Sequence, residues 1–439
     1  MYISACLRRC LLTIAAVVVF TSAVLAAESS PTTFSPVLRF SYTQRMRIET
    51  YDNTTWLAAD SLAGSSYYRQ RVSLMAQYRP SAKIELALKL TEEMRYYFVP
   101  EKRRTDFDQL FVDQLYARLD SVGRKPVNVI LGRQNVEFGE GFLVMDGGPL
   151  DGSRSAYFNA ARADWTVKSG QTLTLVVAYQ PRWDGLLPVI HQHNRYKLLT
   201  EQNELGFMLH YNRPTAKGVL QAYLLRKQAT AYQKYPRIDL NCLGARAKMP
   251  VVTRLTATSE AAIQFGRRGG QDQFSFGGYL YVDWATGWPE LCPRTVTLGG
   301  LFLSGDRYTT SRYEGWDPFW GRWPKWSESY AYALAKERAI AYWTNMASLF
   351  ARTTVTLTPV LDLNFEFHHL TAPRYTDPTA AFPGGNGRTR GNLTIIKLTY
   401  KADKNLTGHV LYESFRPGDF YKPTASAYGW MRMEVMLKF

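Results

Sequence analysis

Apolar and polar residues alternate with a period of two along much of this chain, and this pattern restricts the fold more than any other feature of the sequence. In residues 38–49 one phase reads Leu, Phe, Tyr, Gln, Met, Ile and the other reads Arg, Ser, Thr, Arg, Arg, Glu. Residues 68–79 and 83–95 repeat the pattern. Successive side chains of a β-strand point to opposite faces, so each segment predicts a strand with one apolar and one charged face.

Eighteen such segments follow one another along the chain. An even number of strands is typical of single-chain bacterial outer-membrane barrels, in which the apolar faces meet lipid. We therefore predict an all-β fold, an 18-stranded antiparallel transmembrane β-barrel of the bacterial outer membrane. The predicted strands span residues 37–50, 66–79, 82–96, 110–119, 127–137, 157–167, 171–182, 203–212, 217–228, 238–248, 253–266, 273–284, 294–304, 343–357, 360–371, 391–402, 405–415 and 428–439.

The connections between these segments support a barrel independently. Those after even-numbered segments are short, with only 285–293 somewhat extended, and those after odd-numbered segments are mostly long, with 267–272 as a short exception. Outer-membrane barrels have short periplasmic turns and long external loops, whereas a soluble β-sandwich has no reason to alternate in this way. The predicted long loops are 51–65, 97–109, 138–156, 183–202, 305–342, 372–390 and 416–427.

The N-terminus predicts export. Arg8 and Arg9 precede an apolar stretch that ends in small residues at 24–27, which is typical of a signal peptide over residues 1–27. The residues after the arginine pair match the twin-arginine motif only loosely, so we expect Sec-dependent secretion. Residues 28–439 then form one barrel domain. The mean hydropathy is −0.26 and no later run of eighteen apolar residues occurs, which excludes a helical membrane protein.

The net charge predicts an anionic partner. The chain has 53 Lys and Arg against 37 Asp and Glu, and without the two arginines of residues 1–27 its net charge is +14. An exported chain that lacks zinc and nucleic-acid motifs favours an acidic saccharide, lipopolysaccharide or phosphate over nucleic acid. We expect outer-membrane lipid, lipopolysaccharide and an anionic solute as partners, and the turn 285–293 is a candidate contact for a periplasmic secretion partner.

The charged faces of the first three segments must point into the barrel, since an Arg or Lys at the bilayer midplane costs about 2–4 kcal/mol. These faces carry nine cations, Arg39, Arg45, Arg47, Arg69, Arg71, Arg79, Lys83, Lys89 and Arg95, against Glu49, Glu85 and Glu93. The last segment adds Arg432 in its charged phase and ends in Phe439. Two interpretations stay open: the charges brace the wall as Arg-Glu ladders, or their surplus selects anions in a wet, basic pore.

The predicted external loop 305–342 contains a cluster of aromatic residues and then a helical pattern over 328–342. The aromatic residues are Trp316, Phe319, Trp320, Trp323 and Trp326. Tryptophans stack on sugar faces, which suits a saccharide path, but they equally suit a membrane interface or a plug in the barrel mouth. If the loop folds inward, it is the natural gate.

One region resembles a known family. Residues 131–165 read LGRQNVEFGEGFLVMDGGPLDGSRSAYFNAARADW and resemble the alginate export family of outer-membrane porins. The shared parts are Gly132-Arg133-Gln134, Phe138-Gly139 with Gly141, Arg154, and Ala161-Arg162. A second similarity is Ser304-Gly305-Asp306, followed by Asp317-Pro318-Phe319 and Ser329-Tyr330-Ala331-Tyr332.

The resemblance implies a monomeric barrel that conducts an anionic polysaccharide through an arginine-lined constriction, with Arg133, Arg154 and Arg162 in the substrate path. Arg133 falls in the same phase as Val129 and Leu131, the apparent lipid face, so it faces the pore only if it lies beyond the bilayer or past a bulge. The family does not settle the cargo. Alginate or a related uronate is the first expectation, and a general or small-anion porin is the alternative.

No catalytic set emerges from the sequence. The G-x-S-x-G and H-E-x-x-H motifs are absent, so an outer-membrane hydrolase is the least favoured alternative, and we expect no cofactor or metal. His191 and His193 lack the pattern of a metal site, and His368 beside Glu366 predicts a hydrogen-bonded pair inside the barrel. Cys242 and Cys292 are predicted at different heights of the wall and therefore free.

Overall fold

The computed structural model describes residues 38–53, 57, 64–99, 105–146, 157–168, 170–191, 197–289, 291–321, 327, 344–377 and 383–439. The predicted signal peptide and the predicted helix at 328–342 lie outside these residues. Within the described part of the chain, no helix is long and apolar enough to cross a membrane.

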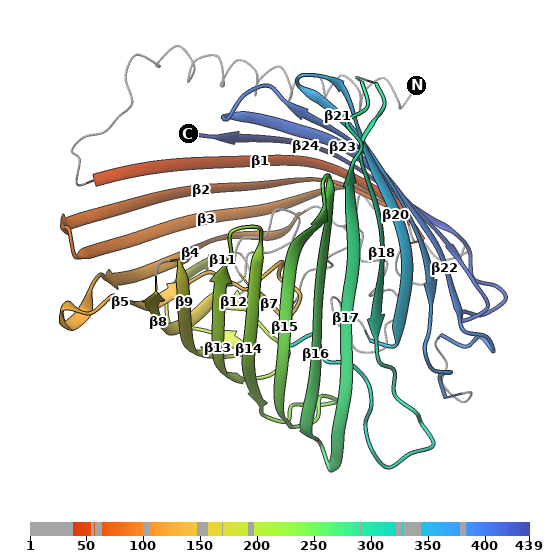
Figure 1. The fold of residues 1–439 in the computed structure, drawn as a ribbon, viewed down its shortest axis with the longest axis horizontal. Coiled ribbons are helices and arrows are strands. Elements are labelled where there is room, and N and C mark those ends of the chain that lie inside the picture. The colour runs from red at the N-terminus through yellow and green to blue at the C-terminus, as the bar shows by residue number, and fades with distance from the viewer. Residues whose placement is uncertain are drawn as a thin grey trace.

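Eighteen antiparallel strands form a closed barrel, as predicted (Figure 1). Each strand pairs with the next along the ring, and the ring closes where the first strand, β1, pairs with the last, β24. The strands are β1 (Leu38–Asp52), β2 (Ser65–Ser81), β3 (Ile84–Val99), β4 (Thr105–Leu119), β5 (Val127–Gln134), β8 (Phe158–Lys168), β9 (Gln171–Gln180), β13 (Glu204–Pro214), β14 (Val219–Ala229), β15 (Ile238–Val252), β16 (Leu255–Arg268), β17 (Gln271–Ala285), β18 (Pro293–Leu303), β20 (Met346–Thr358), β21 (Leu361–Thr371), β22 (Thr389–Lys401), β23 (Leu406–Pro417) and β24 (Tyr428–Lys438).

The period-two pattern decides which face of each strand is buried. In β16, Glu260 and Gln264 are buried inside the barrel, whereas Ile263 and Phe265 are exposed on its outer surface. Exposed apolar residues continue around the outside of the barrel, so its outer surface is apolar and its interior is polar. This inversion of a soluble core is what a lipid environment requires.

The connections alternate in length around the ring, with two differences from prediction. The connection between β4 and β5 covers 120–126 and includes a 3-10 turn, η1 (Val122–Arg124), so 286–292 is not the only extended short-end turn. The connection between β3 and β4 covers only 100–104 because β4 begins at Thr105, five positions before the predicted start. The tight turn at 269–270 is where the short exception was predicted. We call the end of the barrel with the turns 82–83, 253–254 and 359–360 the short-turn end.

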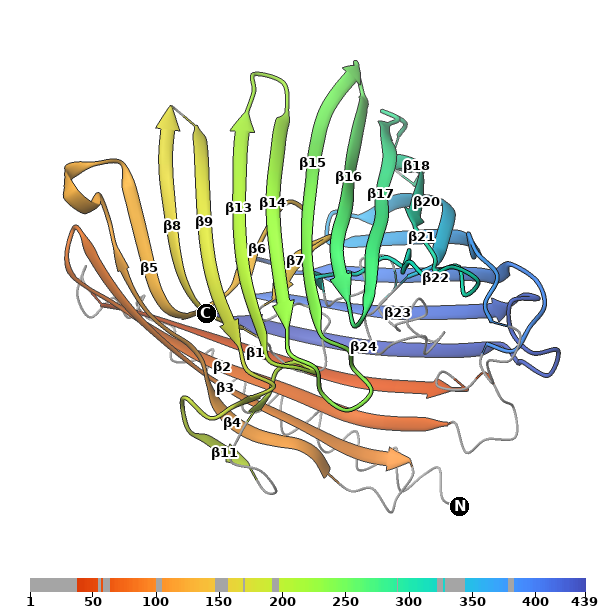
Figure 2. The same ribbon diagram turned by 90° about the horizontal axis from the view of Figure 1, so that it is seen from below.

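Short strands outside the ring form further pairings. β6 (Val136–Glu137), β7 (Val144–Asp146) and β19 (Trp320–Gly321) form a three-stranded sheet, in which β7 and β19 are parallel. β10 (Trp183–Asp184) pairs with β12 (Lys197–Leu198), and β11 (Val189–His191) pairs with β4. In Figure 2, β6 and β7 lie behind the wall made by β13–β16. We call β6, β7 and β19 the inner sheet.

The hydrophobic core lies inside the barrel, where the inner sheet packs on the wall. Phe142, Trp316 and Trp320 belong to one buried cluster with wall residues such as Met208 and Leu225. Cys242 and Cys292 are both free, as predicted: Cys242 is buried in β15 and Cys292 lies in the turn after β17.

Candidate functional site: the charged lumen

Six arginines from four neighbouring strands lie together on the inner face of the barrel, and we call this set the basic wall. They are Arg45 and Arg47 on β1, Arg69 and Arg71 on β2, Arg95 on β3 and Arg432 on β24. The strand register places Arg45 directly opposite Arg71 and Arg47 directly opposite Arg69. Like charges in directly opposed positions destabilise a sheet, so this arrangement is not the one that wall strength alone would favour.

Three carboxylates are set among these arginines. Arg47 contacts Glu434, Arg69 Nη1 lies 3.1 Å from Glu49 Oε1, and Arg71 Nη2 lies 2.9 Å from Glu93 Oε1. The predicted Arg-Glu ladder therefore exists, and it draws Glu434 from the far end of the chain.

Among the described residues, the basic wall has six cations against these three carboxylates. Five of its arginines are buried, with Arg45 4% and Arg71 9% exposed, and Arg95 is partly buried. The interior is closely packed at this level rather than wide open, and charges interact more strongly in such a place than in water.

Other predicted cations lie elsewhere. Arg39 is exposed at the start of β1, and Lys83 is exposed in the turn between β2 and β3, so neither belongs to the basic wall. Their alternation phase is inward, but both positions lie at the short-turn end, where the chain leaves the packed interior. Lys89 Nζ pairs with Asp113 Oδ2 at 2.7 Å. Arg162 Nε donates to Asp164 Oδ1 at 3.0 Å.

Arg133 points inward because the alternation of β5 breaks one residue before it. Leu131 is exposed and Arg133 is 2% exposed, although both share a phase. Gly132 between them has φ +122, and a Cβ there would lie 2.3 Å from Leu115 O. The strand irregularity that the sequence required for a pore-facing Arg133 is therefore at Gly132, and a glycine inside a strand is the signal of such an irregularity. Arg154 lies outside the described residues.

The guanidinium of Arg133 is held on several sides. It donates to Asp184 Oδ2 at 2.5 Å, Asn159 Oδ1 at 3.2 Å and Val112 O at 2.6 Å. Its Cζ lies 3.9 Å from the centre of the Tyr157 ring. Asp184 belongs to β10 in the loop after β9, so Arg133 fastens that loop to the wall.

We expect Gly132→Ala to lower stability by about 1–3 kcal/mol, because alanine is strained at this φ and meets the β4 backbone. Urea titration of the folded barrel, followed by its heat-modifiable gel mobility, measures the change. Gly270→Ala is the matched control, since a Cβ at Gly270 meets nothing within 4 Å. Equal stability of the two variants would show that β5 tolerates a side chain at 132.

The opposite side of the ring, β13–β17, carries the inner sheet. Phe142 stacks on Trp316 with ring centroids 5.4 Å apart, and Phe138 stacks on His210 at 4.3 Å. A Cβ at Gly206 would lie 2.7 Å from the Trp320 ring, so the absence of a side chain there makes room for the indole. The described part of the loop after β18 thus folds inward, whereas Trp323 and Trp326 lie outside the described residues.

Buried polar groups fasten β19 to the wall. Lys227 Nζ on β14 lies 3.3 Å from Glu204 Oε1 and 3.8 Å from Asp317 Oδ1, and donates to Phe319 O at 3.0 Å. Arg268 on β16 pairs with the same Asp317. We call these contacts the polar latch. Alternation predicts inward cations at such positions, but not their partners in a distant loop.

Glu140 lies at the tip of the turn between β6 and β7, where Gly139 and Gly141 have positive φ. It accepts a hydrogen bond from Arg246 Nη2 at 2.7 Å and one from Tyr281 Oη at 2.7 Å. A carboxylate therefore stands across the lumen from the basic wall.

The loop after β18 carries a charge pair at its outer part. Arg307 donates two hydrogen bonds to Glu314 at 2.6 and 2.8 Å, which lowers the pKa of that carboxyl. Burial raises the pKa of Asp306, although Asp306 accepts a hydrogen bond from the Glu314 amide. These hydrogen bonds therefore fix the geometry of this turn independently of the polar latch.

The described residues contain no group of three or more His, Cys, Asp or Glu side chains that would hold a metal ion. His368 Nε2 lies 3.4 Å from Glu366 Oε2, the predicted pair inside the barrel. His193 lies outside the described residues.

A family model described as alginate export matches residues 37–433 of the sequence. The chain belongs to the alginate export family. It is an outer-membrane β-barrel channel, in agreement with the predicted fold and location. No curated protein matches the sequence.

Solved porins share the fold of this alginate export family member. OpdK of Pseudomonas aeruginosa, solved with vanillate, has a TM-score of 0.59 at 13% identity, over 91% of this chain and 98% of that one. OccK2 (OpdF) of Pseudomonas aeruginosa, in complex with glucuronate, has 0.58 at 13%, over 92% and 98%. A BenF-like porin from Pseudomonas fluorescens Pf-5 has 0.59 at 13%, over 92% and 99%. At this identity the likeness concerns the fold.

The described residues among those that carried the resemblance help to build the lumen of this alginate export family member. Gly132 and Arg133 form the irregularity in β5, Gly139 and Gly141 form the turn of the inner sheet, and Asp317 anchors β19. The resemblance thus marks the parts that narrow the interior, which periodicity alone does not reveal.

Proposed function

We propose that this channel is anion-selective and passes an anionic polysaccharide such as alginate or a related uronate, by passive diffusion or export. The arrangement of the basic wall carries the proposal. Two like-charged pairs, Arg45 with Arg71 and Arg47 with Arg69, sit directly opposite each other in a closely packed interior. Opposed like charges lower stability, so a folded chain retains them where they serve a function. Here that function is to attract carboxylates.

The geometry also suits passage rather than permanent binding. Glu49, Glu93 and Glu434 already occupy part of the hydrogen-bonding capacity of the arginines. A passing carboxylate competes with these fixed carboxylates, so it is attracted without being trapped. Channels conduct when binding is favourable enough for entry and weak enough for release.

A small-anion porin is the second candidate function. The porins with the same fold were solved with vanillate and glucuronate, which are single-ring carboxylates. The close packing of the interior also favours a narrow solute in this conformation. Both candidates share anion selectivity and differ in whether a polymer enters.

The purified protein in a planar bilayer under a salt gradient tests both candidates. We expect a reversal potential of the sign that anion preference requires, and concentration-dependent block by an oligouronate but not by a neutral oligosaccharide of equal length. Anion preference with block by glucuronate alone would assign a small-anion porin. A channel without anion preference would contradict the proposal.

A further inference from the structure

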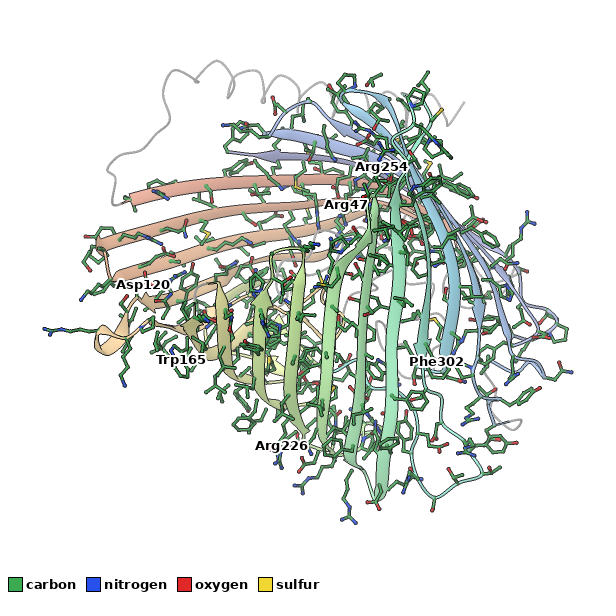
Figure 3. All side chains as sticks on the ribbon, in the orientation of Figure 1. Arg47, Asp120, Trp165, Arg226, Arg254 and Phe302 are labelled. Atoms are coloured by element: carbon green, nitrogen blue, oxygen red, sulfur yellow. The ribbon has the colours of Figure 1, made fainter. Side chains whose placement is uncertain are left out.

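A cavity of about 440 Å³ opens on the inner face of the barrel near the short-turn end, separate from the basic wall. It lies across β16, β17, β18 and β20, on the side of the ring that carries the inner sheet. Figure 3 labels Arg254, one of its lining residues, at the end of the strands where the short turns lie. The lining residues are Arg254, Thr256, Asp283, Ala285, Thr295, Thr297, Arg352, Thr353 and Thr354.

We infer that this cavity is a binding subsite for one sugar-acid unit, a ring that bears hydroxyls and a carboxylate. The inference rests on the proposed function, because it supplies the step at which a uronate unit is held at the short-turn end of the lumen. Its volume lies in the range of small-molecule sites, about 300–1,000 Å³.

Two threonine hydroxyls are oriented to accept hydrogen bonds from a ligand. Thr297 Oγ1 donates to Asp283 Oδ1 at 2.6 Å, and Thr354 Oγ1 donates to Asn364 Oδ1 at 2.7 Å. A hydroxyl whose proton is engaged keeps lone pairs that accept. A ligand that matches them needs hydroxyl donors, as a sugar has.

Arg352 supplies hydrogen-bond donors and a positive charge, whereas the threonine hydroxyls supply acceptors. Its guanidinium lies over the ring of Tyr281, 4.9 Å from the centroid, and its Nη2 is 3.8 Å from Asp283 Oδ1. The stacking fixes the plane of the guanidinium. Its distance to Asp283 is long and the side chain is 30% exposed, so the guanidinium is accessible to a ligand. The planar fork of an arginine matches a carboxylate bidentately.

Arg254 adds a second cation at the mouth of the cavity. Its Nη1 donates to Thr286 O at 3.1 Å, which sets the side chain across the turn between β17 and β18. With two arginines against Asp283, the lining favours an anion. The cavity is therefore neither a neutral sugar site nor a bare anion site.

The cavity is joined to the inner sheet through one side chain. Tyr281 carries the Arg352 guanidinium on its ring and donates from its hydroxyl to Glu140 at the inner-sheet tip. A sugar acid in the cavity thus lies between the inner sheet and the short-turn end.

Titration of the full-length protein in detergent with glucuronate, followed calorimetrically, tests the subsite. We expect Arg352→Gln to weaken glucuronate binding at least tenfold, and Arg352→Lys to restore part of the affinity, because the charge returns without the fork. Lys401→Gln is the matched control, because Lys401 is an exposed cation at the same end, paired with Asp362. We expect a change of less than twofold for it.

The outcomes separate the subsite from the proposed function. Unchanged affinity in Arg352→Gln, with loss of affinity in Arg71→Gln, would place glucuronate at the basic wall and overturn the subsite. Unchanged affinity in both would also overturn it. If the wild-type channel still prefers anions and is blocked by oligouronate, the proposed function stands in either case. Equal affinity of the wild type for glucose and glucuronate would show that Arg352 does not recognise a carboxylate.

Discussion

Replacement of four arginines of the basic wall by glutamine is expected to abolish anion preference and turn it toward cations. The basic wall has six cations against three carboxylates, and two cations remain after the change. The substituted residues are Arg45, Arg47, Arg69 and Arg71. A lumen lined by one sign of charge changes local ion concentration by about tenfold or more, so we expect the anion-to-cation permeability ratio to fall by about that factor.

The reversal potential under a salt gradient measures this change, and it should pass through zero. A control variant replaces three arginines that are about half or more exposed and already paired with a carboxylate, and it should keep the wild-type value. These control positions are Arg226, Arg267 and Arg307. Retained anion preference in the lumen variant would show that ions pass elsewhere.

A second version of the lumen variant guards against misfolding. Loss of arginine partners leaves Glu49, Glu93 and Glu434 buried without the pairs that they now make, which is destabilising. Glutamine at these three positions as well removes the unpaired charges. This variant keeps two cations and no carboxylate in the wall, so it should retain a weakened anion preference rather than become cation-selective, which separates the sign of the wall from its stability.

Lys227→Met is expected to release the inner sheet and raise single-channel conductance. Lys227 is fully buried and contacts both Glu204 and Asp317. Removal of one partner from a buried ion pair costs about 3–5 kcal/mol. The loss falls on the latch, whereas the barrel wall keeps its full ladder of backbone hydrogen bonds, so local opening is expected before global unfolding.

Conductance and limited proteolysis of the segment 304–321 measure this opening. Arg226→Met is the control at the neighbouring position, because Arg226 points to the outer surface, is half exposed and pairs with Asp239 at 3.2 Å. An exposed pair of this kind contributes about 1 kcal/mol or less. Wild-type conductance and cleavage in Lys227→Met would show that the inner sheet holds without the latch.

The wall of the barrel was predictable because its pattern is local. Alternation located all eighteen strands, and loop lengths located their two ends, since both depend on residues close in sequence. The inward direction of Arg133 also has a local cause. Gly132 adopts a positive φ, which shifts the phase, and a glycine between two phase-matched residues was the available signal.

The partners of the inward charges were not predictable. Glu434 reaches Arg47 only because the ring closes between β1 and β24, and Asp113 reaches Lys89 through a pairing that contains register shifts. The inner sheet was missed because its strands are two or three residues long, which is too short for any periodicity.

The sequence by itself determined that this chain forms a membrane barrel with a basic interior, because side-chain alternation along a strand is set by backbone geometry alone. Only the tertiary structure decided which arginines lie together, which carboxylates pair with them and which loops fill the interior. Those contacts join residues as distant as Arg47 and Glu434, or Lys227 and Asp317. They form only when strand register and ring closure bring such positions within reach of an ion pair.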